Sequence, residues 1–279
     1  MSTKNIHINF KTLVEPNETQ NIHYHNGYEL IFITEGTSNF LINNKNIVAG
    51  EGSMLFINNL EKHKMCPKTL PYSRYMIIID SDFLDSFVKE NSLLTIFKIR
   101  RESFIPSFNI DEKNMAKIVS YLEELLKIAT EKKEFWEIEF MHIFSSLLIF
   151  LYREYKNKFP LTHCGNYDQI LKIQSYIDMN FQKDIALNDI ATEFFINKYY
   201  LSHTFKEIVG FSLKQYILLK RISFAKNLLY YSDKSITSIA FESGFNSQSN
   251  FIKLFKKKEA ITPLQFRKKY SKQEQNNVK

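Results

Sequence analysis

Four residues in the first quarter of the chain have side chains that coordinate metal ions or bind polar small molecules: His23, His25, Glu29 and His63. Imidazole and carboxylate groups suit divalent ions such as those of Zn, Mn, Fe or Ni. The same groups can instead contact an effector in a small-molecule pocket, whose aromatic walls would come from Tyr24, Phe32 and Phe56. The residue types therefore indicate either a metal site or a metal-free effector site.

A second set of polar residues lies near the carboxyl terminus, in two segments that read as helices. When the apolar stripe of each helix is set aside, the side chains left to face a DNA groove are Tyr199, Ser202 and His203 in the first, and Gln248, Ser249, Asn250 and Lys253 in the second. Asn and Gln bind adenine in a bidentate manner, and Lys reaches guanine acceptors. Lys206 and Lys256 lie one turn later, where phosphate contact is expected. For each single side chain, solvation or contact with phosphate alone is the alternative.

These helices belong to one pattern that the chain contains twice, about fifty positions apart. In each copy a short amphipathic helix, a tight turn and a longer helix follow one another, which is typical of a helix-turn-helix motif. Alanine at the crossing of the two helices lets their backbones approach closely. The first copy is marked by Leu187, Ile190, Ala191, Ile196, Leu201, Phe205, Lys206 and Gly210, and the second by Ile236, Ile239, Ala240, Phe245, Phe251, Phe255, Lys256 and Ala260.

The positive charge of the chain is concentrated in the same region. Residues 1–165 hold 19 Lys and Arg against 20 Asp and Glu, and residues 166–279 hold 18 against 10, so the two parts carry net charges of −1 and +8. Neutralisation of phosphates by basic residues supplies much of the affinity of proteins for nucleic acids. A basic helical segment beside a neutral one therefore predicts a DNA-binding domain, with a solvated basic surface as the alternative.

Short strands with Gly and Asn turns occupy the first hundred residues. Segments 30–34, 39–43, 53–57 and 74–79 read as strands, and Asn43-Asn44 reads as a hairpin turn, so a small β-barrel is expected. Two amphipathic helices are expected after it, over 111–132 and 134–156. Part of their apolar surface would pack on the barrel, and the surplus would form either more of the same core or a homodimer seam.

Several features limit the class of protein. The two cysteines, Cys66 and Cys164, are far apart and lack C-x-x-C spacing, which argues against a disulfide framework and against a cysteine metal site. The amino terminus has no apolar core of a secretory signal. The longest apolar run, 141–152, is shorter than the ~20 residues that cross a bilayer. A cytoplasmic protein without a membrane segment is expected.

The last hundred residues resemble the AraC/XylS family of transcription regulators, most closely in the second copy. The matching residues run through 236–245, 247–251, Phe255-Lys256 and 262–267. Segment 213–230 resembles the linker helix that holds the family's two motifs apart, which implies that both recognition helices enter adjacent major-groove segments. Ala260 departs from the usual Gly, and Phe195 stands in a turn that often carries a small or polar residue. Phe195 therefore predicts a looser or differently shaped first turn.

The first half resembles the cupin-type sensing domain found at the amino terminus of many AraC/XylS regulators, where a barrel mouth holds an effector. His23, His25, Glu29 and His63 also match the three-His, one-Glu set with which cupin enzymes hold a divalent metal. Regulator cupins often keep part of this set without a metal, so the resemblance favours polar contacts to an effector. A bound metal remains the alternative.

The predicted fold is a two-domain α+β chain. A small cupin-like β-barrel (about 1–110) and two following helices (about 111–156) form an effector-binding and dimerisation domain over 1–156. A linker follows at 157–169. An all-α domain of two helix-turn-helix motifs joined by a linker helix covers 170–270, and 271–279 form a disordered tail.

The predicted function is sequence-specific transcription regulation, with activation favoured and repression the alternative, and with no reaction catalysed and no cofactor. The expected partners are double-stranded promoter or operator DNA, a small-molecule effector that modulates DNA binding, RNA polymerase and a second copy of the chain. The alternatives are a metal-dependent cupin enzyme and a DNA-binding adaptor that is controlled by a protein partner.

Overall fold

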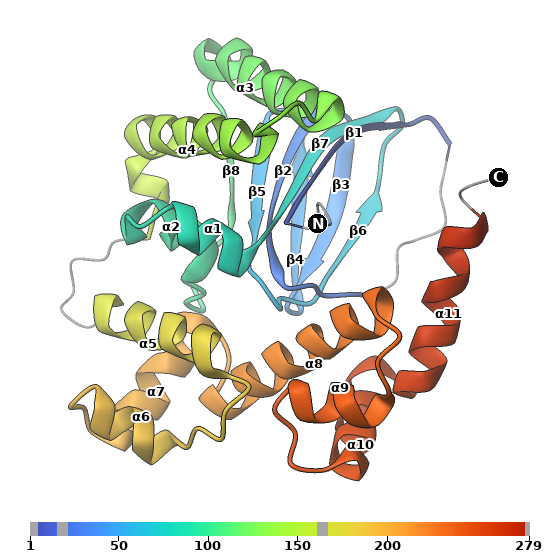
Figure 1. Ribbon diagram of the computed structural model, residues 1–279. Coiled ribbons are helices and arrows are strands. Elements are labelled where there is room, and N and C mark those ends of the chain that lie inside the picture. Colours follow the sequence, from blue (N-terminus) through green and yellow to red (C-terminus); the bar gives the residue numbers. More distant parts are fainter. Residues whose placement is uncertain (1–4, 16–21, 161–166, 277–279) are drawn as a thin grey trace. The chain divides into compact units, whose positions relative to one another are not determined.

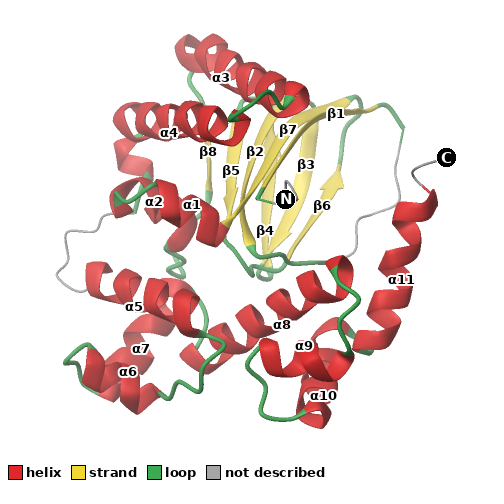
Figure 2. Ribbon diagram, viewed as in Figure 1, coloured by secondary structure: helices red, strands yellow, loops and turns green. Residues whose placement is uncertain are grey.

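A computed structural model describes residues 5–15, 22–160 and 167–276 of the chain (Figure 1). The chain divides into two compact units, residues 1–168 and 169–279. Antiparallel strands and helices make up the described part of the first unit, whereas the described part of the second is helical (Figure 2). No helix within the described residues combines the length and the hydropathy that a bilayer-spanning segment needs.

Two antiparallel sheets form the β-structure of the first unit. The five-stranded sheet has the order β1 (Ile6–Leu13), β7 (Tyr72–Asp80), β2 (Gly27–Glu35), β5 (Ser53–Ile57) and β8 (Ser107–Asn109). The three-stranded sheet has the order β4 (Lys45–Gly50), β3 (Thr37–Ile42) and β6 (His63–Pro67). All four predicted strands and the Asn43-Asn44 turn are confirmed; both turn residues have positive φ, 44° and 69°, which suits a two-residue hairpin.

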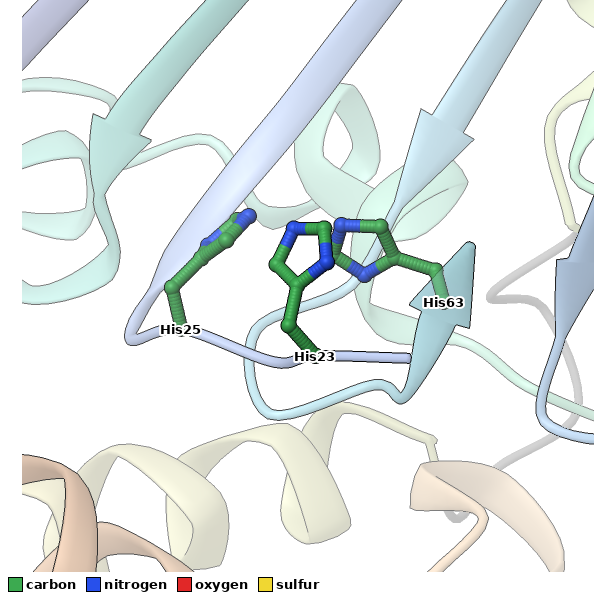
Figure 3. A group of neighbouring side chains, drawn as sticks. All are labelled: His23, His25 and His63. Atoms are coloured by element: carbon green, nitrogen blue, oxygen red, sulfur yellow. The ribbon is translucent and has the colours of Figure 1, made fainter. Parts of the chain in front are cut away.

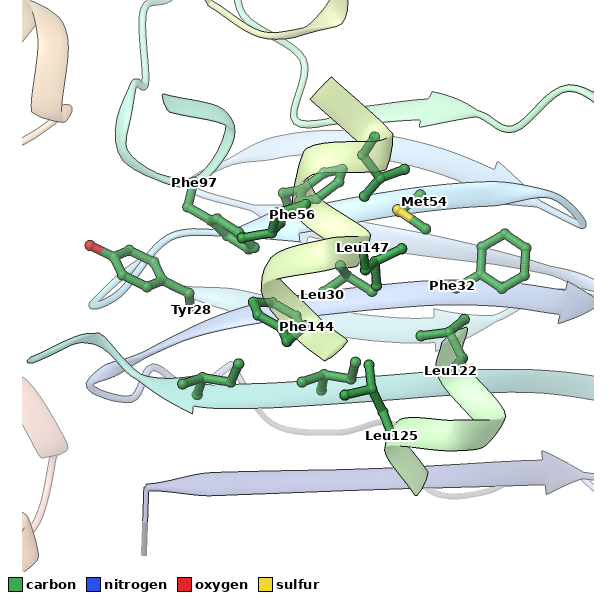
Figure 4. Close-up of a cluster of buried hydrophobic side chains, with 14 of the residues drawn as sticks. Tyr28, Leu30, Phe32, Met54, Phe56, Phe97, Leu122, Leu125, Phe144 and Leu147 are labelled. Carbon is green, nitrogen blue, oxygen red and sulfur yellow. The ribbon is translucent and has the colours of Figure 1, made fainter. Parts of the chain in front are cut away.

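The two faces of the five-stranded sheet contribute to different cores because successive side chains of a strand point in opposite directions. One face meets the three-stranded sheet, and the barrel interior between them is filled by Ile31, Ile33, Phe40, Ile42, Ala49, Leu55, Ile57, Met65 and Tyr72. The opposite face is covered by helices (Figure 4). Strand β2 is consequently buried on both faces over most of its length.

Helices α3 (Glu112–Glu131) and α4 (Trp136–Glu154) cover that second face, together with α2 (Asn91–Lys98). Their apolar stripes, including Leu122 and Leu125 of α3 and Phe144 and Leu147 of α4, are fully buried against the sheet. Each such side chain stabilises the fold by about 1.5–3 kcal/mol relative to exposure. The two predicted helices are therefore confirmed, and an intramolecular core accounts for the stripes. Helices α1 (Ser81–Phe87) and η1 (Lys156–Lys158) are short.

The second unit contains helices that form two helix-turn-helix motifs around a central helix. Helix α5 (Tyr167–Asn180) begins at the boundary between the units. The first motif comprises α6 (Leu187–Glu193) and α7 (Lys198–Val209), and the second comprises α9 (Ile236–Glu242) and α10 (Gln248–Glu259). Between them lies α8 (Leu213–Tyr231), which corresponds to the expected linker helix. Ala191 and Ala240 are buried in α6 and α9, as the close helix crossing predicts.

The chain closes with α11 (Pro263–Asn276), whose end lies within the stretch 271–279 expected to form a disordered tail. Residues 271–276 continue the helix because Lys, Gln and Glu are good helix formers. Residues 161–166 of the expected linker and 277–279 of the tail lie outside the described residues.

Candidate functional site

One end of the barrel, which we call the barrel mouth, carries four polar residues: His23, His25, Glu29 and His63. The backbone of His23 pairs with that of His63 at the start of β6: His23 N donates to His63 O at 3.1 Å, and His63 N donates to His23 O at 2.9 Å. Leu60 N donates to His25 O at 2.9 Å. The side chain of Glu29 lies on the face of β2 that also points Ile31 and Ile33 into the barrel interior. Backbone pairing thus brings together residues that are forty positions apart.

The four side chains of the barrel mouth, those of His23, His25, Glu29 and His63, converge. One ring nitrogen of each histidine lies within 4.8 Å of those of the other two, and the rings point toward one another (Figure 3). Glu29 Oε2 is 3.1 Å from His25 Nε2 and 3.1 Å from His63 Nε2. Glu29 and His63 are buried, His25 is partly buried and His23 is exposed. All four members of the predicted set are therefore together in space.

The protonation of His63 is fixed on one side by the backbone. His63 Nδ1 lies 2.9 Å from Glu61 O, and because a carbonyl oxygen can only accept, Nδ1 is the donor. In the neutral imidazole the lone pair then lies on Nε2. This atom is buried and lies 3.1 Å from Glu29 Oε2. Protonated on both nitrogens, the ring donates to Glu29 as well as to Glu61 O.

The neighbouring charges in the barrel mouth lower the pKa of Glu29 and raise the pKa of His63. Burial by itself would raise the pKa of Glu29, but the hydrogen bond and charge of His25 and His63 outweigh burial and hold this pKa well below its ordinary value. Burial would likewise lower the pKa of His63, but Glu29 and the carbonyl of Glu61 outweigh it and raise this pKa. The barrel mouth thus stabilises a carboxylate and, beside it, a positive charge.

A buried salt bridge that the sequence reasoning missed supports the loop that carries His63. Arg100 Nε donates to both carboxylate oxygens of Glu61, at 3.1 and 3.0 Å, and Arg100 also donates to Phe56 O at 2.9 Å. Asn58 N donates to Glu61 Oε2 at 2.9 Å. In the sequence, Glu61 stands out only as an acidic residue two positions before His63. Its partner, Arg100, lies 39 positions further along the chain.

The predicted aromatic walls do not line the barrel mouth as a group. Tyr24 is buried on the same segment as His23 and His25. Phe32 and Phe56, however, point away from the barrel interior and into the core beneath α3 and α4 (Figure 4). The reason is the strand period: Phe32 lies three residues after Glu29 on β2 and therefore occupies the opposite face.

The first unit also has a wide cavity that the sequence did not predict. Its volume is about 1160 Å³, and it lies where β4 and β8 meet the end of α4 and the helix η1. Charged and apolar groups line it, among them Lys45, Ile105, Glu154 and Lys158. A cavity of this size accommodates an organic ligand.

The predicted DNA-contacting side chains of the first motif lie on one face of α7. Asn197 caps this helix by accepting a hydrogen bond from Tyr199 N at 2.8 Å. Leu201 and Phe205 are fully buried on the inner face. The exposed residues at positions i, i+3, i+4 and i+7 are Tyr199, Ser202, His203 and Lys206. This spacing makes one continuous polar face on the outside of the helix.

The second motif presents its predicted residues in the same way. Ser247 caps α10 by accepting from Asn250 N at 3.3 Å, and Phe251 and Phe255 are fully buried on the inner face. Gln248 is the first residue of the helix, and its Oε1 accepts from Thr237 Oγ1 of α9 at 2.9 Å. The predicted residues Gln248, Ser249, Asn250, Lys253 and Lys256 are all exposed.

The turns of the two motifs have the same backbone geometry, contrary to the looser first turn that Phe195 predicts. Phe195 has φ 52° and Gly244 has φ 84° at the equivalent position. Phe195 N donates to Thr192 O and Gly244 N donates to Phe241 O, three residues back in each case. The Phe195 side chain fits because it is 95% exposed.

A barrel with a convergent polar mouth, followed by two helix-turn-helix motifs with exposed polar helices, defines a ligand-responsive DNA-binding regulator. Residues 15–148 match the family model described as an AraC-like ligand binding domain, and residues 190–269 match the one described as a helix-turn-helix domain. The chain belongs to the AraC/XylS family of transcription regulators. Its first unit is the ligand-binding domain and its second the DNA-binding domain.

Relatives from several bacteria agree with this assignment. The transcriptional activator RhaS of Klebsiella pneumoniae is 21% identical over 88% of this chain and 86% of its own length. The uncharacterized regulator YdeC of Bacillus subtilis is 24% identical over 93% and 90%. The regulatory protein PocR of Salmonella typhimurium is 33% identical, but over only 39% of this chain and 35% of its own length. These relatives are transcription regulators.

Solved structures share the fold along nearly the whole chain. The crystal structure of ToxT from Vibrio cholerae has a TM-score of 0.57 at 18% identity and covers 96% of this chain and 99% of that one. Wild-type ToxT bound to an unsaturated fatty acid has a TM-score of 0.57 at 16% identity, with 96% of each chain covered. At this identity the likeness concerns the fold alone.

Proposed function

We propose that the chain recognises a specific promoter or operator sequence through the exposed faces of α7 and α10, and that a ligand of the first unit modulates this binding. It acts in the cytoplasm as a homodimer that activates transcription by contacting RNA polymerase, and it catalyses no reaction. One observation carries the proposal: all nine residues selected from the sequence as DNA contacts are exposed, whereas Leu201 and Phe205 of α7 and Phe251 and Phe255 of α10 are buried between them.

The side chains divide into those that read bases and those that position the protein. Asn250 and Gln248 have the paired donor and acceptor that bind adenine in the major groove, and Lys253 reaches guanine acceptors. Lys206 and Lys256 lie one turn further along their helices and bind phosphate, which fixes the register without reading sequence. Lys257 and Lys258 also lie in the last turn of α10 and add to the positive charge.

The first unit offers two places for a ligand. The barrel mouth has convergent polar groups, and the cavity of about 1160 Å³ has room for an organic molecule. The ToxT structure with a fatty acid supports the idea that a related fold binds a small amphipathic molecule. In this chain Lys45 and Lys158, at the edge of the cavity, suit a ligand that carries a carboxylate.

Fluorescence anisotropy with a duplex from the region upstream of the coding sequence tests DNA recognition. We expect binding that survives excess unrelated duplex and weakens with salt, because released counterions contribute to affinity. Asn250→Ala should lower the discrimination between the operator and a duplex mutated at one base pair by about 1–3 kcal/mol. Lys256→Ala should instead weaken binding to all duplexes and reduce the salt slope by about 1.

The matched control is Lys113→Ala, which removes an exposed positive charge from the first unit. It should leave affinity and salt slope unchanged. Sequence-specific recognition by α10 is contradicted if Asn250→Ala and Lys113→Ala have the same effect, or if unrelated duplex displaces the operator at equal concentration throughout the salt series.

A further inference from the structure

We infer that the barrel mouth binds one divalent transition-metal ion through His23, His25, Glu29 and His63. The inference deepens the proposed function, on which it rests for the role of the ion as a ligand of the sensing unit. The binding itself depends only on the described residues of the first unit. Three observations carry it: the spacing of the ligand atoms, the burial of Glu29 and His63 side by side, and the packing behind the site.

The ligand atoms are spaced as they are around a single ion. Metal–ligand bonds to His nitrogen and carboxylate oxygen are about 2.0–2.2 Å long, which places two ligands about 3.0–3.5 Å apart at ordinary tetrahedral or octahedral angles. Glu29 Oε2 lies 3.1 Å from both His25 Nε2 and His63 Nε2. One ring nitrogen of each histidine lies within 4.8 Å of those of the other two, so His23, which is exposed, completes the set of ligands at the rim.

Two buried ligand groups face each other at this point. The Glu61 carbonyl accepts from His63 Nδ1 and so holds Nε2 toward the Glu29 carboxylate, 3.1 Å away. A metal ion between the two groups is bound by both, in place of the proton that an imidazole and a carboxylate at this distance otherwise share.

The site is built for an ion rather than for an organic molecule. Behind Glu29 the barrel interior is filled by apolar side chains, including Ile31, Phe40 and Ile57. The ligands are also held in place before binding: His23 and His63 pair through their backbones, and His63 donates its other ring N–H to a carbonyl. A metal-binding histidine is oriented in this way in most proteins, because the outer hydrogen bond fixes the ligand tautomer.

The donor set selects the chemical class of the ion. Three imidazoles and one carboxylate suit Zn²⁺, Ni²⁺, Co²⁺, Fe²⁺ or Mn²⁺, whereas Ca²⁺ and Mg²⁺ prefer oxygen ligands. Within this class, affinity for nitrogen and oxygen donors rises from Mn²⁺ towards Cu²⁺ and is high for Zn²⁺. We therefore expect tight binding of Zn²⁺ and Co²⁺ and no measurable competition by Mg²⁺.

Calorimetric titration of the untagged, chelator-treated full chain with Zn²⁺, and absorption spectra of the Co²⁺ form, test the inference. One equivalent should bind, and Co²⁺ should show visible bands of nitrogen and oxygen ligation. His63→Gln and His23→Gln should each weaken binding by at least about 10–100-fold. His142→Gln removes an exposed histidine of α4 that lies outside the barrel mouth and should change nothing.

Circular dichroism of each variant without metal separates ligand loss from unfolding, and His23→Gln is the safer variant because His23 is exposed. The absence of stoichiometric binding, or equal losses in His23→Gln and His142→Gln, overturns the metal site. Anisotropy with operator DNA on the same preparations tests the proposed function separately. Specific DNA binding without metal binding removes the metal inference alone, whereas metal binding without specific DNA binding removes the proposed function alone.

Discussion

Gln248 shows how a single residue can be oriented for base recognition. It is the first residue of α10, and its Oε1 accepts a hydrogen bond from Thr237 Oγ1 on α9 at 2.9 Å. An amide oxygen has two lone pairs, so Oε1 can still accept from an adenine amino group while Nε2 donates to the ring nitrogen. Thr237 therefore restricts the side chain of Gln248 without using up its recognition groups. We regard it as a positioning residue.

Thr237→Val should reduce the discrimination at the base pair that Gln248 reads, by about 1 kcal/mol or roughly fivefold, because it removes one hydrogen bond while keeping the shape. Competition anisotropy with duplexes mutated at single base pairs measures this effect. Thr192→Val is the matched control on α6, where the hydroxyl bonds only to the carbonyl of Asn188 in its own helix. If Gln248→Ala changes the preference and Thr237→Val leaves it intact, Thr237 has no positioning role.

At the scale of elements, the two helix-turn-helix turns have the same backbone in different surroundings. Gly244 has φ 84°, and a Cβ built on it would lie 2.6 Å from the backbone oxygen of Gln182. The loop that contains Gln182 is in turn held by Arg221 of α8, which donates to Phe181 O at 2.7 Å. The second turn is therefore packed against the segment that joins α5 to α6, whereas Phe195 in the first turn is 95% exposed.

Gly244→Ala should lower the free energy of unfolding of the second unit by about 1–3 kcal/mol, because the left-handed backbone and the close carbonyl both oppose a Cβ. Phe195→Gly should have the opposite sign and stabilise by up to about 1 kcal/mol, because it relieves the left-handed strain without loss of a buried contact. Urea unfolding followed by circular dichroism measures both. If both substitutions lower the free energy of unfolding by the same amount, the Phe195 side chain stabilises the first turn and the strain argument is wrong.

Local patterns in the sequence predict where helices, strands and turns lie better than they predict which face of a strand points into the barrel. The Asn43-Asn44 turn and the stripes of α3, α4, α7 and α10 follow from short-range periodicity and turn chemistry. Phe32 and Phe56 were assigned to the barrel mouth because strand periodicity alone does not say which face is the interior of a sheet covered on both sides. The pairing of Glu61 with Arg100 depends on the tertiary fold and left no periodic signal.

At the scale of the whole molecule, the chain places ligand recognition and DNA recognition in different compact units. The histidine cluster and the filled barrel belong to the first, and the basic helices to the second. If metal binding regulates DNA binding, the two sites are joined by a coupling free energy, for which about 1–3 kcal/mol is typical. Such a coupling must be the same in both directions, because it depends only on the free energies of the four states of binding.

Saturating Zn²⁺ should therefore change the affinity of the full chain for its operator by about 5–150-fold, and saturating operator DNA should change the affinity for Zn²⁺ by the same factor. Anisotropy measures the first factor, and calorimetric titration of the preformed complex measures the second. In His63→Gln the operator affinity should be insensitive to Zn²⁺, whereas His142→Gln should respond like the unmodified chain. Operator affinity that is equal with and without Zn²⁺ means that the ion has no regulatory role. Two unequal factors mean that Zn²⁺ also acts outside the barrel mouth, because a single pair of coupled sites cannot produce them.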